Sequence, residues 1–358
     1  MTPVTKPYFP EIDKYVSYLK QMYKAERLTN NGPLVVELEE VLKHYLGVRN
    51  ILLVANGTIA LQLAYKLAGL SGEVITTPFS FVATTSSLLW EGLTPVFVDV
   101  DKNTFNINPE KVEAGITEST SAIVATHVFG NPCETLKLKE LAEKHNLKLI
   151  YDAAHAFAVR ENGVSALSAG DMSTLSFHAT KLFHTGEGGA LVINDDELYS
   201  KAKRIINFGI EGDGNISDIG INGKMSELQA AMGLCVLDDL ESILQKRKEI
   251  SSLYFDGLKD VVRFQEVKET VLQNYSYFPV VFEEPGAATR VKYELMRKGI
   301  DARRYFFPSL NRLSFLRSTQ QCKESELLAS TILCLPSHFT LDSSTQKLII
   351  DTVREAVY

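Results

Sequence analysis

Short apolar runs alternate with helical segments between residues 51 and 193, and this alternation constrains the fold more than any other feature of the chain. The apolar runs lie at 51–54, 73–76, 95–98, 122–126, 147–152, 172–177 and 190–193. Apolar residues at helical spacing, with turn signals at the ends, place helices at 11–26, 34–45, 56–67, 78–90 and 135–145. Parallel strands need crossover connections, which are usually helices. The pattern therefore predicts an α/β fold with a mostly parallel sheet sandwiched between helices.

The second half of the chain has a different pattern. A glycine-rich loop at 209–223 precedes a long, partly amphipathic helix that is predicted over 224–250. Beyond residue 255 the apolar runs are shorter and mix strands with helices, which indicates an α+β domain. The predicted strands lie at 261–264, 277–282 and 331–335, and the helices at 288–298 and at the C-terminal end. We therefore divide the chain into an N-terminal arm and helix (1–33), a large α/β domain (34–223), a connecting helix (224–255) and a small C-terminal domain (256–358).

Charge and cysteine content narrow the possible functions. A net charge of −7 over 358 residues argues against a general nucleic-acid binder, which needs a basic face. No apolar run reaches the roughly 18 residues that a membrane span requires, and the N-terminal segment lacks the layout of a signal peptide. The four cysteines are far apart and show no metal-binding spacing, so we expect reduced, packed thiols in a cytoplasmic protein.

Lys181 is the residue that points most directly to chemistry. It lies in a loop that becomes glycine-rich, between an apolar run that ends at Phe177 and another that begins at Ala190. Burial lowers the pKa of an amine and makes it nucleophilic, which suits a Schiff base with an aldehyde cofactor or a carbonyl substrate. Taken alone, a lysine in such a position is more often a solvated loop residue.

Other polar or aromatic residues also follow predicted strands, where ligands bind in open parallel sheets. The backbone N–H groups and hydroxyl of Gly57-Thr58 could hold a phosphate at a helix N-terminus, although Asn56 or Thr58 could simply cap that helix. Asp152 ends a strand, where a carboxylate needs a cationic or N–H partner such as a protonated pyridine nitrogen, or could cap the next helix. Phe81 could stack on a planar ring or belong to the core, and His155 could be structural.

Five segments in this order resemble the DegT/StrS family of sugar-nucleotide aminotransferases, and the resemblance covers nearly the whole chain. The segments are Leu28-Thr-Asn-Asn-Gly-Pro-Leu34, Asn56-Gly-Thr-Ile-Ala-Leu61, Asp152-Ala-Ala-His-Ala156, Ser176-Phe-His-Ala-Thr-Lys181 followed by Glu187-Gly-Gly189, and Asn222-Gly-Lys-Met-Ser-Glu-Leu-Gln-Ala-Ala231. The wording around Lys181 is most similar to that of enzymes that form a 4-amino-4,6-dideoxyglucose nucleotide.

The resemblance implies pyridoxal-phosphate-dependent transferase fold type I and assigns a role to each matching residue. Lys181 would form the Schiff base with pyridoxal 5′-phosphate and move the proton between substrate and cofactor. Asp152 would pair with the pyridine nitrogen. The other implied cofactor contacts are Gly57, Thr58 and Ser176 at the phosphate, Phe81 stacked on the ring, His155 near the phenolic oxygen, and Asn222 at the phosphate of the neighbouring subunit. The last contact implies a homodimer with shared active sites.

The implied reaction transfers the amino group of L-glutamate to a keto-deoxysugar nucleotide through the pyridoxamine 5′-phosphate form. The expected substrate is dTDP-4-dehydro-6-deoxy-D-glucose and the products are dTDP-4-amino-4,6-dideoxy-D-glucose and 2-oxoglutarate, in the biosynthesis of a surface polysaccharide such as O-antigen. Alternatives are a 3-aminotransferase for a 3-keto sugar nucleotide and a non-catalytic cofactor-binding regulator. The related dehydratases have histidine at the lysine position, so Lys181 counts against that activity. Lys224 stands where relatives often have arginine, and the roles of Arg303 and Arg304 stay open.

Overall fold

The computed structural model describes residues 1–212, 214–316 and 320–357, and its centre is one seven-stranded sheet. The strands are β1 (Ile51–Val54), β2 (Glu73–Thr76), β3 (Thr94–Phe97), β4 (Thr120–Thr126), β5 (Lys148–Asp152), β8 (Met172–Ser176) and β9 (Gly189–Ile193). Their order is β1-β9-β8-β5-β4-β2-β3. From β3 to β8 all neighbours are parallel, and β9 runs antiparallel to both β8 and β1. The predicted mostly parallel sheet is confirmed.

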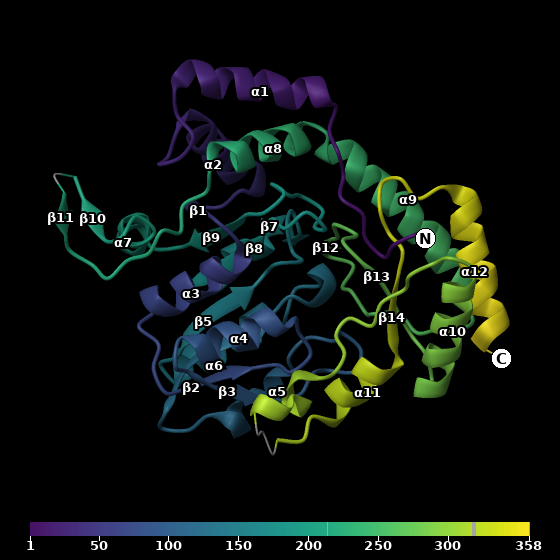
Figure 1. Ribbon diagram of the computed structural model, residues 1–358. Coiled ribbons are helices and arrows are strands. Elements are labelled where there is room, and N and C mark those ends of the chain that lie inside the picture. Colours follow the sequence, from purple (N-terminus) through teal and green to yellow (C-terminus); the bar gives the residue numbers. More distant parts are fainter. Residues whose placement is uncertain (213, 317–319, 358) are drawn as a thin grey trace.

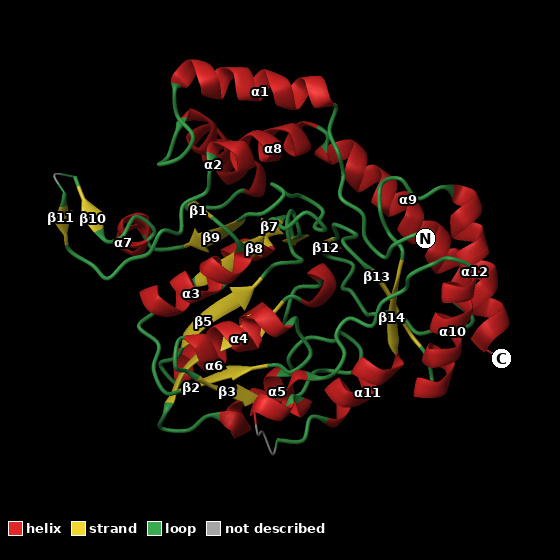
Figure 2. Ribbon diagram, viewed as in Figure 1, coloured by secondary structure: helices red, strands yellow, loops and turns green. Residues whose placement is uncertain are grey.

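Helices cover both faces of this sheet, as fold type I requires (Figures 1 and 2). Successive strand residues point to opposite faces, so Leu52 and Val54 pack on one side while Ile51 and Leu53 pack on the other. The first side is covered by α3 (Gly57–Leu67), α4 (Val82–Trp90) and α7 (Asp196–Ile205). The second is covered by α2 (Pro33–Leu46) and α8 (Glu227–Asp238) near β1, and by α5 (Pro109–Val112) and α6 (Thr135–Lys144) near β4.

The single long helix predicted over 224–250 is wrong. The chain forms two helices there, α8 and then α9 (Leu240–Leu258), and the break lies at Asp239, which has φ −99° and ψ 0°. The Asp239 carboxylate accepts hydrogen bonds from Tyr8 and Lys14, on the N-terminal arm and on α1 (Ile12–Ala25). α8 packs in the apolar cluster beneath β1 and β9, so only α9 runs toward the C-terminal region.

The C-terminal region has its own apolar cluster, built around two antiparallel strands. These strands are β13 (Phe278–Val281) and β14 (Ile332–Leu335), and the helices of the region are α10 (Pro285–Arg297), α11 (Lys323–Thr331) and α12 (Ser343–Val357). The predicted strand at 261–264 is replaced by one isolated bridge between Arg263 and Val281. The separate cluster favours the proposed α+β domain, although the domain boundaries stay a prediction.

Two small sheets decorate the surface. One joins β6 (Arg160–Glu161), β7 (Val164–Ser165) and β12 (Val271–Leu272). The other is a hairpin of β10 (Ile210–Glu211) and β11 (Asn215–Ile216), inside the stretch that was expected to be a plain loop. All four cysteines are buried and free, as predicted. Among the described helices, none is both long enough and apolar enough to cross a membrane.

Glu227 joins α8 to α2 through a fully buried carboxylate. Its two oxygens accept hydrogen bonds from the backbone N–H groups of Leu34 and Val35, both at 2.9 Å. These donors belong to the first turn of α2, where N–H groups have no partner within the helix and where negative charge is favourable. Gly32 makes room for this contact, because a Cβ at that position would lie 2.5 Å from the carboxylate carbon of Glu227.

Replacing Glu227 with alanine should destabilise the protein by about 2–4 kcal/mol, because two buried N–H groups lose their acceptor. Urea unfolding followed by circular dichroism measures the change. Glu37→Ala, an exposed acid on α2, is the matched control and should change the free energy of unfolding by less than about 0.5 kcal/mol. Equal stability of the two variants would contradict this role for Glu227.

Candidate active site

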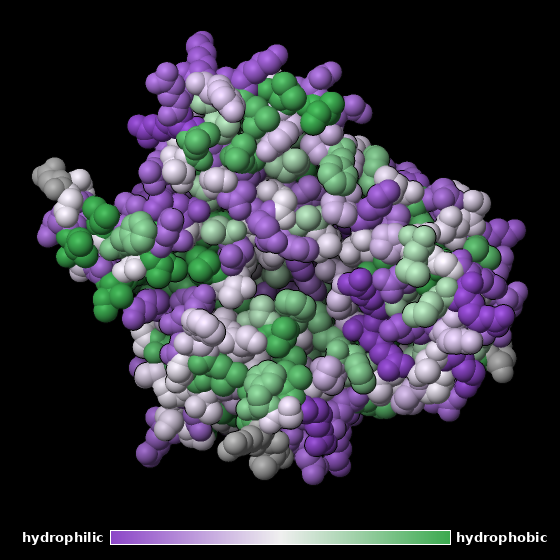
Figure 3. Space-filling view, in the orientation of Figure 1, coloured by the Kyte–Doolittle hydropathy of each residue, from purple (hydrophilic) through white to green (hydrophobic). Residues whose placement is uncertain are grey.

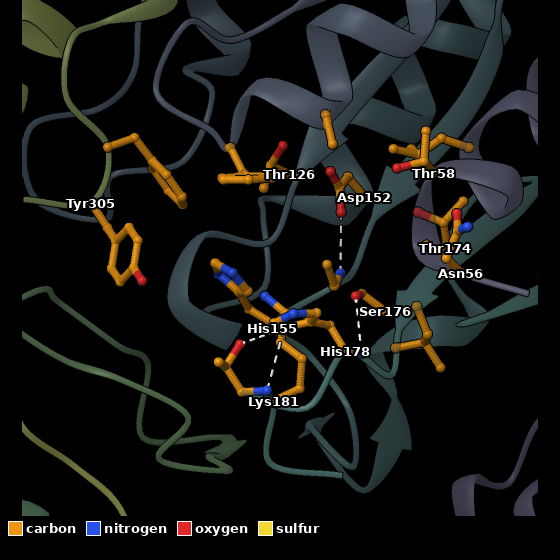
Figure 4. Close-up of a pocket in the computed structure, with 18 of the residues that line it drawn as sticks. Asn56, Thr58, Thr126, Asp152, His155, Thr174, Ser176, His178, Lys181 and Tyr305 are labelled. Atoms are coloured by element: carbon orange, nitrogen blue, oxygen red, sulfur yellow. Dashed lines mark hydrogen bonds between the residues drawn. The ribbon is translucent and has the colours of Figure 1, made fainter. Parts of the chain in front are cut away.

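A cavity of about 410 Å³ lies where the carboxyl ends of the parallel strands meet the N-terminus of α3. Its size is within the usual range for small-ligand sites, and its place is where ligands bind in open α/β sheets. Figure 4 shows side chains from several elements converging on this space. Seven of the eight residues expected to bind a cofactor line it: Gly57, Thr58, Phe81, Asp152, His155, Ser176 and Lys181.

Asp152 is the last residue of β5 and is only 6% exposed. One carboxylate oxygen accepts a hydrogen bond from the hydroxyl of Thr84 at 2.6 Å, and the other accepts one from the N–H of Ala154 at 3.1 Å. Among the described residues Asp152 forms no ion pair. A buried carboxylate held in this way can still take a cationic N–H partner from the cavity.

Lys181 faces the same cavity from the loop between β8 and β9. Burial lowers the pKa of its amine from 10.5 to about 8, and the Asp152 carboxylate and Tyr305 oppose this change. The amine donates a 3.4 Å hydrogen bond to the hydroxyl of Tyr277. A solvated loop lysine would show neither feature. An amine whose pKa lies close to neutral pH can act both as a nucleophile and as a proton carrier.

The first turn of α3 provides an anion site. The side chain of Asn56 caps the helix by accepting from the N–H of Ile59 at 2.9 Å, so the alternative that Asn56 is an N-cap is correct. In the described part of the chain, the N–H groups of Gly57 and Thr58 have no hydrogen-bond partner. Ser176 lies against this turn, because a Cβ on Gly57 would come within 2.9 Å of the Ser176 Cβ. Free N–H groups, a helix N-terminus and two hydroxyls suit a phosphate.

His155 is buried in the cavity wall as a neutral ring. Burial holds the pKa of His155 well below its ordinary value, and the positive charge of Lys181 lowers this pKa further. Its Nδ1 accepts a hydrogen bond from the N–H of Phe129 at 3.3 Å, so the proton of the neutral ring lies on Nε2. His155 therefore offers one hydrogen-bond donor, which matches the proposed contact with a phenolic oxygen.

Phe81 and Asn222 differ from the rest of the set. Phe81 precedes α4 and is 57% exposed, so an aromatic ring stands at the cavity without belonging to the core. Asn222 does not line the cavity; it is exposed and forms a backbone bridge with Asn207. The single chain therefore does not bring Asn222 to the site that holds Lys181.

The structure adds residues that sequence reasoning did not assign. Thr84 holds Asp152, and its position only three residues after Phe81 was the available signal. Further residues of the cavity wall come from the C-terminal half: Tyr277, Arg303, Tyr305 and Phe306. Arg303 lies in a segment whose role had been left open, and the structure shows that it reaches the cavity.

The chemistry of these groups fits pyridoxal 5′-phosphate. The cradle at Gly57, Thr58 and Ser176 suits its phosphate, Asp152 suits a protonated ring nitrogen, and the amine of Lys181 suits its aldehyde. Gly189 keeps the cradle open, because a Cβ there would lie 2.6 Å from the backbone carbonyl carbon of Asn56.

Comparison with known proteins decides the family. Residues 11–354 match the DegT/DnrJ/EryC1/StrS aminotransferase family. The chain belongs to this family. It is accordingly a pyridoxal-phosphate-dependent aminotransferase, and the predicted family, fold type and cofactor are confirmed.

Individual relatives cover almost the entire chain. A dTDP-4-amino-4,6-dideoxy-D-glucose transaminase of Shigella dysenteriae is 44% identical over 98% of both chains. An enzyme of the same name from Escherichia coli is 40% identical over 95% of this chain and 94% of its own. The crystal structure of the protein DesI in the presence of its TDP-sugar product superimposes with a TM-score of 0.95, at 34% identity, over 99% of this chain and 93% of that chain.

The titration of Lys181 can be measured in the cofactor-free protein. Acylation of Lys181, followed by mass spectrometry, should show a midpoint near pH 8, because only the neutral amine reacts. Asp152→Asn should move the midpoint to lower pH, since it removes the carboxylate charge that stabilises the ammonium form of Lys181. Asp13→Asn, an exposed change on α1, should leave it near 8. A wild-type midpoint near the ordinary lysine value of about 10.4 would contradict the burial of this amine.

Proposed function

We propose that this aminotransferase moves the amino group of L-glutamate to C4 of dTDP-4-dehydro-6-deoxy-D-glucose, giving dTDP-4-amino-4,6-dideoxy-D-glucose and 2-oxoglutarate. The observation that carries the proposal is 44% identity over nearly the full length to a transaminase named for this product. A surface polysaccharide such as O-antigen is the proposed destination of the amino sugar, and the cytoplasm is the proposed compartment.

In the proposed reaction each residue has a defined task. The bound cofactor supplies an aldehyde that carries the amino group and a ring that takes up electrons. Lys181 Nζ removes the proton from Cα of glutamate, and in the second half of the reaction it delivers a proton to C4 of the sugar. Its pKa of about 8 makes both directions feasible near neutral pH. Asp152 stabilises the protonated ring nitrogen, and the α3 N-terminus with Ser176 holds the phosphate.

The assay for this function has two parts. Protein loaded with pyridoxal 5′-phosphate should show visible absorbance that L-glutamate bleaches, and Lys181→Ala should abolish both the bleaching and turnover. Lys347→Ala, an exposed lysine on α12, should behave as wild type. NMR of the product formed from the 4-keto nucleotide should place the amine at C4.

Other results would support the alternatives. An amine at C3 of a 3-keto nucleotide, with no turnover of the 4-keto compound, would favour a 3-aminotransferase. Bound cofactor without turnover of any amino donor would favour a regulator. Full activity of Lys181→Ala would overturn the assignment of the lysine.

We further propose a homodimer in which Asn222 completes the partner's site. Asn222 is exposed outside the cavity of its own chain, and exposed apolar residues lie near it in sequence: Phe208 (49%), Ile219 (81%) and Ile221 (41%). Figure 3 shows apolar side chains gathered around the β10–β11 hairpin. Exposed apolar surface of this kind favours a protein interface.

Mixing two inactive variants tests the shared site. Lys181→Ala and Asn222→Ala homodimers should each have little activity. After subunit exchange, half of the dimers are mixed and one of their two sites is intact, so about a quarter of wild-type activity should return. Light scattering measures the assembly and the coupled glutamate assay measures activity. If Asn222 served its own chain, the mixture would regain no activity.

A further inference from the structure

The amine of Lys181 has one hydrogen-bond acceptor among the described side chains, the hydroxyl of Tyr277 at 3.4 Å. The same amine lies 5.6 Å from the centre of the Tyr277 ring. Tyr277 comes from the segment just before β13, 96 residues away in sequence, and lines the cavity. The hydroxyl of Tyr277 therefore contacts Lys181 Nζ, the atom that is expected to carry the proton, although the two residues are far apart in sequence.

The backbone before Tyr277 is fixed to the large sheet domain by buried hydrogen bonds. The amide of Asn274, which is 1% exposed, donates to the backbone carbonyls of His155 and Phe157, both at 2.8 Å. Its oxygen accepts from the N–H of Ser276 at 3.1 Å. The hydroxyl of Ser276 also donates to the His155 carbonyl, at 3.3 Å. This arrangement ties the segment to the same turn that carries His155.

A buried arginine also holds this segment. Arg247 of α9 is 3% exposed and donates to the backbone carbonyls of Ser276 at 2.8 Å and Tyr275 at 3.4 Å. Burying a guanidinium is costly, and here it is directed at carbonyl oxygens rather than at a carboxylate. These two hydrogen bonds fix the backbone directly before Tyr277, which gives the buried guanidinium a structural role.

The ring of Tyr277 is equally constrained. Its centroid lies 4.7 Å from the ring of His155, 5.7 Å from Phe129 and 5.6 Å from Tyr305. Burial raises the pKa of the Tyr277 hydroxyl, which therefore stays protonated and neutral at physiological pH. A neutral hydroxyl can accept a hydrogen bond from an ammonium group and can donate one to a neutral amine.

We propose that Tyr277 is a positioning residue that holds the amine of Lys181 in the cavity whenever this amine is not bonded to the cofactor. The hydroxyl limits the free amine to one direction, so the amine remains within reach of the substrate carbon. The bond serves both protonation states, because the hydroxyl changes from acceptor to donor as the amine loses its proton. The proposal rests on the proposed role of Lys181 as proton carrier.

Tyr277→Phe is the decisive variant, because it keeps the ring and its packing and removes only the hydroxyl. Two readouts are expected to change. In cofactor-free protein the midpoint for acylation of Lys181 should fall below the wild-type value, because the hydrogen bond to the charged ammonium form is stronger than the one to the neutral amine, so its loss destabilises the ammonium form more. In the holoenzyme kcat should fall about tenfold, as expected for one lost hydrogen bond to a charged group, with little change in the KM for glutamate.

Tyr275→Phe is the matched control. It removes a hydroxyl from the same segment, two residues away, and its side chain does not line the cavity. Wild-type values are expected for its acylation midpoint and its kcat. Unfolding measurements on both variants show whether folding is intact.

Three outcomes would overturn the proposal: unchanged midpoint and kcat in Tyr277→Phe, an equal effect of Tyr275→Phe, or a loss of stability that accounts for the effect. The acylation experiment uses neither cofactor nor substrate. A wrong sugar or amino donor therefore cannot produce a false result. Failure of the proposed function would instead appear as activity in Lys181→Ala or as a different product.

Discussion

The site depends on a close approach between backbones at the end of the sheet. The first turn of α3 lies against the ends of β8 and β9, where a Cβ on Gly57 would come within 2.9 Å of Ser176 and a Cβ on Gly189 within 2.7 Å of the Gly57 nitrogen. Because both positions are glycine, the helix N-terminus reaches the strand ends without steric overlap. The positive end of α3, the Ser176 hydroxyl and the loop that carries Lys181 therefore share one space. Any larger residue at either glycine would separate the anion site from the amine.

Burial outweighs charge attraction at Lys181. The Asp152 carboxylate favours the ammonium form, yet the pKa of the amine falls to about 8. Removal from water destabilises the charged amine more than the Asp152 charge stabilises it. The balance leaves a large neutral fraction near physiological pH. Thr84 and the Ala154 N–H hold the carboxylate in place, so its effect on the amine depends on a fixed position. Burial and the Asp152 charge thus oppose each other, and the resulting lysine can both take up and release a proton.

Local patterns were sufficient to predict the sheet but not the contacts between remote segments. The strands were predictable because they are short apolar runs, and those in the middle of the sheet are buried on both faces. The break at Asp239 was not, because the sequence there continues at helical spacing and the carboxylate instead bonds Tyr8 and Lys14, more than 200 residues away. Tyr277 was missed for the same reason: nothing near it in sequence indicates that its hydroxyl meets Lys181. Resemblance supplied the position of Asn222, although a single chain does not bring it to the cavity.

The two sides of the cavity come from different parts of the fold and differ in how they are built. The sheet side carries Asp152 at the end of β5 and Lys181 in a short loop, the two residues to which the proposed reaction gives the ring nitrogen and the proton transfer. The C-terminal side carries Arg303, which is exposed and can meet a charged substrate without a large desolvation cost. His155 connects the two, because its ring is parallel to that of Phe306 at 5.9 Å and its backbone carbonyl accepts from Asn274. The neutral imidazole beside the amine therefore contacts both sides of the cavity.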